Sequence, residues 1–242
     1  RVLFRSRAVA NPCNPHAADQ MTTFETIRLD IDAAGVARLT LARADVHNAL
    51  NPTMFAEIGQ ALDLIEADPA VRVVVLSGEG ENFCAGGDFR WQQSQGDQDR
   101  ASRIRSGVPL AQILARLDTF GRPIIGRING SAYGGGVGLI AICDVVVAVD
   151  SARISLSEVR LGLVPATISP YVAAKLGPSY ARRVFLNGKI MTAAEAQRYG
   201  LVHEVVSAAD LDKAVNAEID LALACAPGAV QMTKKLVQFL MA

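Results

Sequence analysis

Two glycine-rich segments constrain this chain more than any other feature of its sequence. The first, at 82–88, reads NFCAGGD, and the second, at 129–139, reads NGSAYGGGVGL. Each follows an apolar run rich in β-branched residues, at 71–76 and 123–128, and each leads into a predicted helix. A strand, a tight glycine turn and a helix start leave backbone N–H groups free to face a ligand. Two such turns side by side could hold a developing oxyanion, such as the enolate of a thioester.

Length and composition indicate one globular α/β protein with a substantial core. The chain has 242 residues, 50% of them hydrophobic, and 24 Lys and Arg residues balance 24 Asp and Glu residues. A neutral chain without a basic run lacks the electrostatic footprint of a nucleic-acid-binding protein. No apolar stretch reaches the roughly 18 residues that suggest a membrane-spanning helix. We therefore expect a cytoplasmic protein without a nucleic-acid or membrane partner.

The cysteines offer neither a disulfide framework nor a metal site. Cys13, Cys84, Cys143 and Cys225 are widely spaced, and no histidine lies near them at a metal-ligand spacing. Reduced thiols in a cytosolic protein and no bound metal are the expectation. Cys84 lies inside the first glycine turn, where we expect it to pack as a small apolar residue.

Residues 1–20 differ from the rest of the chain. They hold three arginines and two prolines without hydrophobic periodicity, and Met21 follows them as a natural start. We expect a non-native or disordered extension, with an organellar leader as the alternative.

Hydrophobic periodicity predicts alternating strands and helices in the remaining chain. A polar stretch at 92–106 is expected to cover the surface and to be mobile. Strands are predicted at 24–31, 36–41, 71–76, 123–128, 144–149 and 201–206. The first two alternate around a turn at 32–35 and predict a hairpin, and the continuous apolar run at 71–76 predicts a strand buried on both faces. Helices are predicted at 52–67, 109–120, 136–142, 193–199, 211–224 and 230–240.

Five collinear motifs resemble the crotonase superfamily, the enoyl-CoA hydratase/isomerase group. The resemblance implies an α/β fold, a spiral of ββα units at 21–190, and a helical C-terminal region at 191–242 that assembles homotrimers or dimers of trimers. It also implies an acyl-CoA substrate and no permanently bound cofactor, coenzyme A being part of the substrate. The motifs are RADVHNALN at 43–51, NFCAGGDF at 82–89, NGSAYGGGVGLIAICD at 129–144, SEVRLGLVP at 157–165 and GKIMTAAEAQRYGLV at 188–202.

The same resemblance assigns roles around the two turns. The family's oxyanion donors fall on the backbone N–H groups of Gly87 and Gly135, although either glycine alone could be explained by a tight turn. Asp88 is also predicted to cap the following helix, with a catalytic carboxylate as the alternative. Contacts to the coenzyme A part of the substrate are expected from Val46, Ala49, Ala85, Gly87, Asp88 and Phe89.

The acid–base residues depart from the family pattern. Family hydratases usually carry two glutamates, and here Gly138 stands at the first position and Glu158 at the second. Glu158 lies among apolar residues, where desolvation raises a carboxyl pKa, although an ion pair with Arg160 is an alternative role. A single base suffices to move a double bond, which favours an enoyl-CoA isomerase. The string at 157–172 instead resembles bacterial hydratases of branched, methylglutaconyl-type CoA esters in leucine breakdown, and we place hydratase first.

A carboxylated substrate would need a cation near the acyl pocket, for which Arg90, Arg103 and Arg105 are candidates. Family members generally continue past the helix at 232–236, so the resemblance implies a truncated chain or a more open site. A non-catalytic acyl-CoA-binding protein is the alternative from another functional class.

Overall fold

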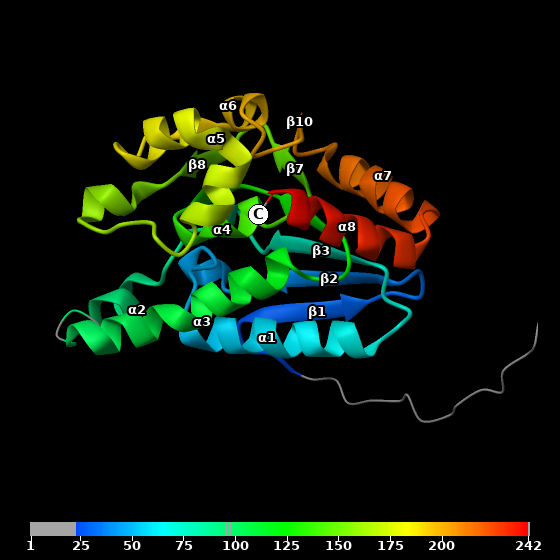
Figure 1. The fold of residues 1–242 in the computed structure, drawn as a ribbon, viewed down its shortest axis with the longest axis horizontal. Coiled ribbons are helices and arrows are strands. Elements are labelled where there is room, and N and C mark those ends of the chain that lie inside the picture. The colour runs from blue at the N-terminus through cyan, green and yellow to red at the C-terminus, as the bar shows by residue number, and fades with distance from the viewer. Residues whose placement is uncertain (1–22, 95, 97, 242) are drawn as a thin grey trace, which may run out of the picture.

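The computed structural model describes residues 23–94, 96 and 98–241. The extension predicted at residues 1–20 lies outside the described residues. The described chain is an α/β fold in which helices cover both sides of a large sheet (Figure 1). Among these residues, no helix combines the length and apolar character that a membrane crossing requires.

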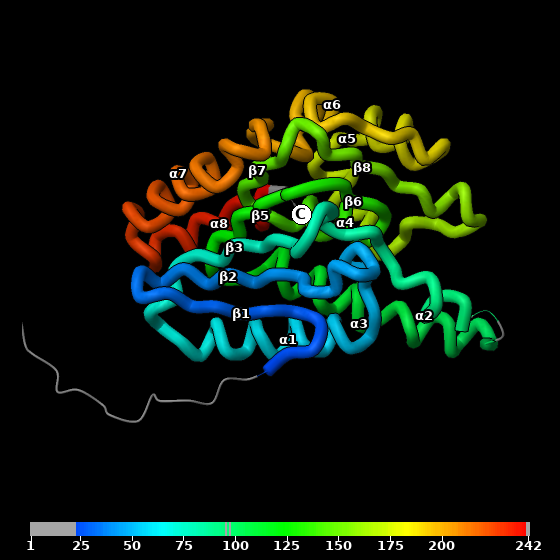
Figure 2. The backbone as a smooth tube through the Cα atoms, turned by 180° about the vertical axis from the view of Figure 1, so that it is seen from behind, coloured from blue at the N-terminus to red at the C-terminus, as the bar shows by residue number. Residues whose placement is uncertain are grey.

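The larger sheet has six strands in the order β1-β2-β3-β5-β7-β10. The first two form the predicted antiparallel hairpin, and the others pair in parallel. Figure 2 shows β1, β2, β3, β5 and β7 following one another across the sheet. The strands are β1 Ile27–Ile31, β2 Val36–Leu41, β3 Val73–Gly78, β5 Ile124–Ile128, β7 Val145–Val149 and β10 Glu204–Val206.

A second sheet of four short strands, in the order β4-β6-β8-β9, explains the spiral. Three successive chain segments each contribute one strand to the large sheet and the next to the small sheet: β3 and β4, β5 and β6, β7 and β8. This repeat confirms the predicted α/β fold with ββα units. The short strands are β4 Asn82–Cys84, β6 Ser131–Tyr133, β8 Arg153–Ser155 and β9 Met191–Thr192.

Eight α-helices occur among the described residues, and most agree with the hydrophobic periodicity. The first begins with Pro52, and Asn51 caps it by accepting a hydrogen bond from the Met54 N–H. The helices are α1 Pro52–Ala67, α2 Phe89–Ser94, α3 Arg100–Asp118, α4 Gly135–Ala141, α5 Ser169–Phe185, α6 Ala193–Arg198, α7 Leu211–Ala224 and α8 Pro227–Met241. Two 3-10 helices occupy Ala44–Val46 and Ser157–Leu161.

Two helices differ from the predicted ones. Helix α3 starts at Arg100, with Asp99 as its cap, rather than at the predicted residue 109, and α2 and α3 both extend into the polar stretch at 92–106. The sequence analysis predicted no helix at 169–185, where α5 is found. Gly177 and Pro178 lie inside α5, and the non-helical backbone of Gly177 divides it at a kink.

The core has two parts because the large sheet is buried on both faces. Val74 and Leu76 of β3 face the larger cluster with α1 and α3, whereas Val73 and Val75 face the smaller cluster with α7. Successive strand residues point to opposite faces, so a continuous apolar run is what this position requires. The structure confirms the prediction that the β3 run is buried on both faces.

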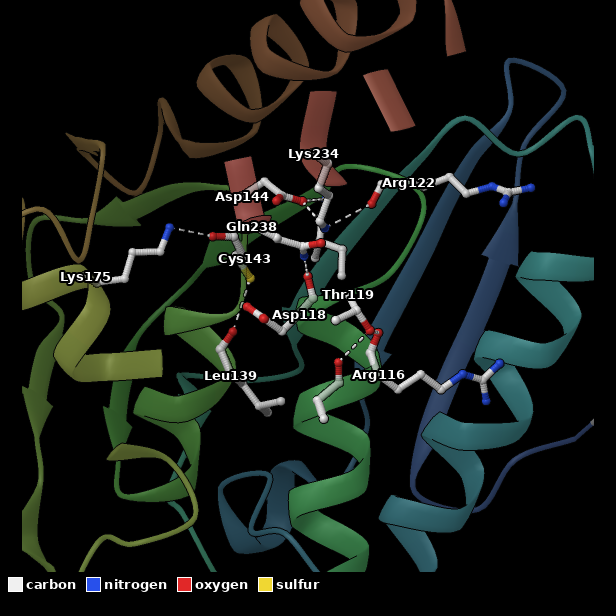
Figure 3. Close-up of polar contacts among 12 residues, drawn as sticks. Arg116, Asp118, Thr119, Arg122, Leu139, Cys143, Asp144, Lys175, Lys234 and Gln238 are labelled. Carbon is white, nitrogen blue, oxygen red and sulfur yellow. Dashed lines mark hydrogen bonds and ion pairs between the residues drawn. The ribbon is translucent and has the colours of Figure 1, made fainter. Parts of the chain in front are cut away.

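Polar contacts fix α8 against the body of the protein (Figure 3). The Lys234 ammonium lies 2.7 Å from the Asp144 carboxylate and donates a longer bond of 3.4 Å to the Arg122 carbonyl oxygen. One turn later, the Gln238 amide donates to the Asp118 carbonyl oxygen at 2.5 Å. The last described helix is therefore attached to the end of α3 and to the residues just before β5 and β7.

Candidate active site

One cavity of about 220 Å³ brings together segments that are far apart in the sequence. The first glycine turn, the second glycine turn and the 157–168 segment form its walls, and α3 adds Leu110. Four residues of the sequence-predicted site line it: Ala85, Gly87, Gly135 and Glu158.

The first turn leaves the Gly87 N–H without a protein acceptor within the residues that the structure describes. Its neighbours pair with Leu50: the Leu50 N–H donates to the Gly86 carbonyl at 2.7 Å, and the Asp88 N–H donates to the Leu50 carbonyl at 2.8 Å. In such a parallel bridge, the intervening Gly87 N–H points away from Leu50. It has no acceptor among the described residues. The turn therefore offers one free donor to a ligand.

The second turn offers a matching donor. Gly134 has a φ of 48° and donates its own N–H to the Ser155 carbonyl at 3.0 Å, while Gly135 is the first residue of α4. The Gly135 N–H, like other N–H groups of a first helical turn, has no acceptor in the described part of the chain. Both free amides belong to residues that line the same cavity.

Glycine is required here because the two turns pass within van der Waals contact. A Cβ on Gly86 would lie 2.8 Å from the Tyr133 carbonyl oxygen, and a Cβ on Gly136 would lie 2.6 Å from that of Cys84. Neither backbone atom can move away independently of its turn. Cys84 of the first turn is buried, and this burial raises the pKa of its thiol to about 12, which agrees with a packing role.

Glu158 lies next to the second turn. Its Oε1 atom is 3.0 Å from the position that a Cβ on Gly134 would occupy. Its Oε2 atom is buried and has no hydrogen-bond partner among the described residues. Removal from water raises the pKa of the Glu158 carboxyl, and a hydrogen bond from its own backbone N–H opposes this only in part. No ion pair joins it to Arg160, whose guanidinium donates to the Asn187 carbonyl instead.

There is no room for a side chain at Gly138, the position that corresponds to the usual first glutamate. Gly138 is buried in the middle of α4, and the Ile168 side chain occupies the place where a Cβ would stand. The Leu114 side chain lies 3.6 Å from the same point. Within the described lining of the cavity, Glu158 is therefore the single carboxylate.

A buried asparagine holds the first turn in place. Asn48 has no exposed surface, and its side-chain amide donates to the carbonyl oxygens of Glu79, Asn82 and Phe83 at 2.9–3.1 Å. Its side-chain oxygen accepts from the Arg43 N–H at 2.9 Å. Sequence reasoning missed Asn48, although an asparagine within a family motif was an available signal.

The residues predicted to contact coenzyme A are divided by the structure. Ala85 and Gly87 line the cavity, whereas Val46, Ala49, Asp88 and Phe89 lie outside its lining. Ala49 is buried, Val46 is half-buried, and Phe89 is 68% exposed.

Asp88 caps the start of α2, as the sequence predicts. Its Oδ1 accepts from the Arg90 N–H at 3.0 Å and the Trp91 N–H at 3.3 Å, and its Oδ2 lies 2.9 Å from the Arg43 guanidinium. Burial opposes ionisation, but Arg43 and the two amides outweigh it and lower the pKa of this carboxyl. Asp88 is therefore an ionised residue that stabilises the start of α2.

Several lining residues were not predicted. Trp91 packs edge-on against Phe55, with ring centroids 5.8 Å apart, and Gln92 places its side-chain amide over Gly87. The chain's single tryptophan, close behind a glycine turn, was the available signal. The remaining lining is apolar or uncharged: Leu50, Ser157, Leu161, Leu163, Val164, Pro165, Ala166, Thr167 and Ile168.

The described residues give no sign of a metal centre or of a charged acyl pocket. They contain no group of three or more His, Cys, Asp and Glu side chains able to hold a metal ion. The candidate cations Arg90, Arg103 and Arg105 are exposed and outside the cavity lining.

Comparison with known proteins identifies relatives with a shared description. A family model described as "Enoyl-CoA hydratase/isomerase" matches residues 32–240. The 2,3-dehydroadipyl-CoA hydratase of Escherichia coli K12 is 36% identical over 70% of this chain and 65% of its own length. The (E)-benzylidenesuccinyl-CoA hydratase of Thauera aromatica is 33% identical over 83% of this chain and 77% of its own length.

A crystal structure of an enoyl-CoA hydratase from Shewanella pealeana is similar in fold. It superposes with a TM-score of 0.87 and 33% sequence identity, covering 90% of this chain and 81% of that chain.

Proposed function

Because this chain is an enzyme of the enoyl-CoA hydratase/isomerase family, we propose that it adds water to a 2-enoyl-CoA thioester. The observation that carries the proposal is that two free amides and one carboxylate, whose Oε2 has no hydrogen-bond partner among the described residues, belong to residues lining a single cavity. Attack at Cβ of an enoyl thioester moves charge onto the thioester oxygen, and an enolate forms. Two preorganised N–H donors stabilise that charge most strongly in the transition state.

Glu158 performs both proton transfers in this proposal. As a carboxylate it takes a proton from the attacking water while the water oxygen bonds to Cβ. The electron pair of the Cα–Cβ double bond moves toward the carbonyl, whose oxygen accepts hydrogen bonds from Gly87 and Gly135. The protonated Glu158 then returns the proton to Cα, and the carbonyl re-forms. The balance is one water added, and the carboxyl ends in its starting state.

The environment of Glu158 supports this double role. A general acid–base works best when its pKa lies near the working pH, and burial raises the pKa of Glu158 in that direction. The buried Oε2 has no hydrogen-bond partner among the described residues, so in this proposal the carboxyl group turns to present an oxygen to a water molecule in the cavity. A buried polar atom without a hydrogen-bond partner destabilises the folded state. Such atoms are retained at functional sites.

The acyl group of the substrate is proposed to be uncharged. The sequence resemblance suggested a branched, glutaconyl-type ester, whose second carboxylate would require a cation. No Lys or Arg side chain lines the cavity among the described residues. An apolar wall formed by side chains such as Leu110, Trp91 and Ile168 favours an uncharged acyl group instead.

A second candidate function is movement of the double bond in a 3-enoyl-CoA. The observation that favours it is the closed position at Gly138, which leaves one carboxylate to carry a proton from one carbon to another. Absorbance of the conjugated enoyl group separates the two functions. Hydration removes this absorbance from a 2-enoyl ester and gives a 3-hydroxyacyl product, whereas isomerisation creates it from a 3-enoyl ester. Appearance of absorbance without any hydration would overturn the hydratase proposal.

We also propose that the C-terminal helices assemble copies of this chain into a trimer or a dimer of trimers. Exposed apolar side chains support this: Leu221, Met232, Leu236, Phe239 and Leu240. Such a surface is unusual on a monomer. Sedimentation velocity across a range of concentrations should give a trimeric or hexameric mass, and a purely monomeric protein would contradict the proposal.

A further inference from the structure

A second cavity of about 600 Å³ is lined in part by other residues of elements that also line the first. The ends of α3 and α4, the start of α5 and one side of α8 form its walls. Its inner surface is apolar around Ile142, Tyr171 and Val237. Among the charged groups that line it, Lys234 pairs with Asp144, and the Lys175 ammonium donates to the Cys143 carbonyl at 3.0 Å (Figure 3). The Asp118 carboxyl lines the same cavity, and its removal from water raises its pKa.

Helix α3 runs from one cavity to the other. Leu110 lines the first cavity and Asp118 lines the second. Leu114 lies halfway between them on the same face, because residues four apart share one side of a helix. It is fully buried and lines neither cavity.

Helix α4 follows the same order. Gly134 and Gly135 line the first cavity, and Ala141 and Ile142 line the second. Gly138 lies between them and has no side chain of its own. The gap this leaves is filled from α5 and α3, by Ile168 and Leu114.

The start of α5 completes the partition. Ile168 lines the first cavity and is 2% exposed, while Pro170 and Tyr171 line the second. Three neighbouring elements, α3, α4 and α5, therefore each contribute residues to both cavities, and Leu114, Gly138 and Ile168 lie between these two sets of residues.

We propose that Ile168, supported by Leu114, closes the acyl pocket and limits this enzyme to short acyl chains. The inference rests on the proposed function. The first cavity is smaller than the roughly 300–1,000 Å³ of ordinary small-molecule sites, so little room remains beyond the reacting carbons. The apolar space that a longer chain would need exists, but it lies behind Ile168.

The test compares binding and turnover for two chain lengths. Butyryl-CoA and decanoyl-CoA, which cannot be hydrated, report binding by calorimetry, and crotonyl-CoA and 2-decenoyl-CoA report turnover. The wild-type protein should bind decanoyl-CoA no more tightly than butyryl-CoA. Its kcat/KM should be at least about 10-fold lower for the decenoyl ester than for crotonyl-CoA, which is within the range that pocket size alone imposes.

Ile168→Ala should raise the ratio of decenoyl to crotonyl kcat/KM at least about 10-fold, and decanoyl-CoA should bind more tightly. Ile168→Val, a smaller change that retains most of the packing, should shift both readouts in the same direction. Leu114→Ala should do so from α3. Ile65→Ala is the matched control, because Ile65 is equally buried in α1 and lines neither cavity.

Each outcome decides between the inference and the proposed function. Equal binding and turnover of both chain lengths by the wild type, or an unchanged ratio in the Ile168 and Leu114 variants, would overturn the inference. Chain-length-dependent binding that Ile168→Ala relaxes, without turnover of any ester, would support the wall but overturn the hydratase proposal. Absence of binding to every CoA ester would overturn both.

Discussion

The Cβ atom of Ile168 lies 3.0 Å from the position that a Cβ on Gly138 would occupy, and its Cγ2 lies closer still. The Ile168 side chain thus fills the space that a side chain at Gly138 would occupy. The two residues are thirty positions apart, in α4 and at the start of α5. This relationship explains why the cavity contains one carboxylate and why it ends where it does.

Gly138→Ala should destabilise the protein by about 1–3 kcal/mol, the usual cost of overpacking a core. Alanine gains up to about 1 kcal/mol of helix propensity over glycine, but the buried Ile168 leaves no room for the added methyl group. Urea unfolding measures the difference. Gly107→Ala in α3 is the control, since a Cβ there meets nothing within 4 Å and should stabilise. Ile168→Ala in the same chain should remove most of the penalty, and two strictly additive effects would contradict direct contact.

Glu158→Gln should lower kcat/KM by about 10²–10⁴, the range for loss of a general acid–base. The amide keeps the shape of the side chain but cannot carry the proton from water to Cα. Steady-state kinetics and calorimetric binding of a saturated acyl-CoA should separate lost chemistry from lost binding. Glu204→Gln, on the exposed strand β10, is the control and should leave both values unchanged. Normal turnover by Glu158→Gln would refute the assignment.

The pH dependence follows from the burial of Glu158, which raises its pKa above the ordinary value of 4.5. Activity requires the carboxylate, so kcat/KM should rise with pH through a pKa above that value. For stability, a raised folded pKa favours the protonated folded state below the ordinary value, and this contribution disappears as pH rises through the folded pKa. Glu158→Gln should therefore gain stability relative to the wild type between acidic and neutral pH. A difference that is constant with pH would argue against the raised pKa.

Gly135→Pro should lower kcat by about 10²–10³, the usual cost of losing one oxyanion donor. Proline is tolerated at the first position of a helix, which Gly135 occupies in α4, and it removes the N–H. Gly135→Ala adds a Cβ near Leu50 but keeps the N–H, and it serves as the matched variant. If the two variants lose activity equally, crowding rather than the missing donor is responsible.

Asn48→Ala should destabilise the protein by at least about 2 kcal/mol, because it leaves several buried backbone groups without partners. Turnover should also fall, since this asparagine joins the segment before α1 to the first glycine turn. Asn216→Ala on the exposed side of α7 should change stability by no more than about 0.5 kcal/mol. Thermal unfolding and kinetics on the same samples check both expectations.

Much of the fold was predictable from local pattern. The hairpin, the α1 helix with its asparagine cap and the strands buried on both faces are written in periodicity and capping residues, which act over a few positions. The short strands β4, β6, β8 and β9 were not predicted, because two or three residues carry too little periodicity. Their existence depends on pairing between segments far apart in the chain.

The site divides in the same way. The sequence motifs predicted the glycine turns, Glu158 and the glycine at position 138 in place of a glutamate. Trp91, Gln92 and Asn48 were missed, because nothing in their spacing says which surface they face. The pairing of Asp88 with Arg43 likewise depends on how two loops approach each other.

Three features of this protein follow from local sequence. Glycine stands where the chain must turn or approach closely, apolar runs stand where a strand is buried, and a carboxylate lies among apolar neighbours. These are consequences of local sterics and solvation, which each residue carries with it. The position of Ile168 beside Gly138, between residues of the two cavities, can be seen only in the folded protein. Packing at that point depends on the simultaneous positions of α3, α4 and α5, and no single segment of sequence contains that information.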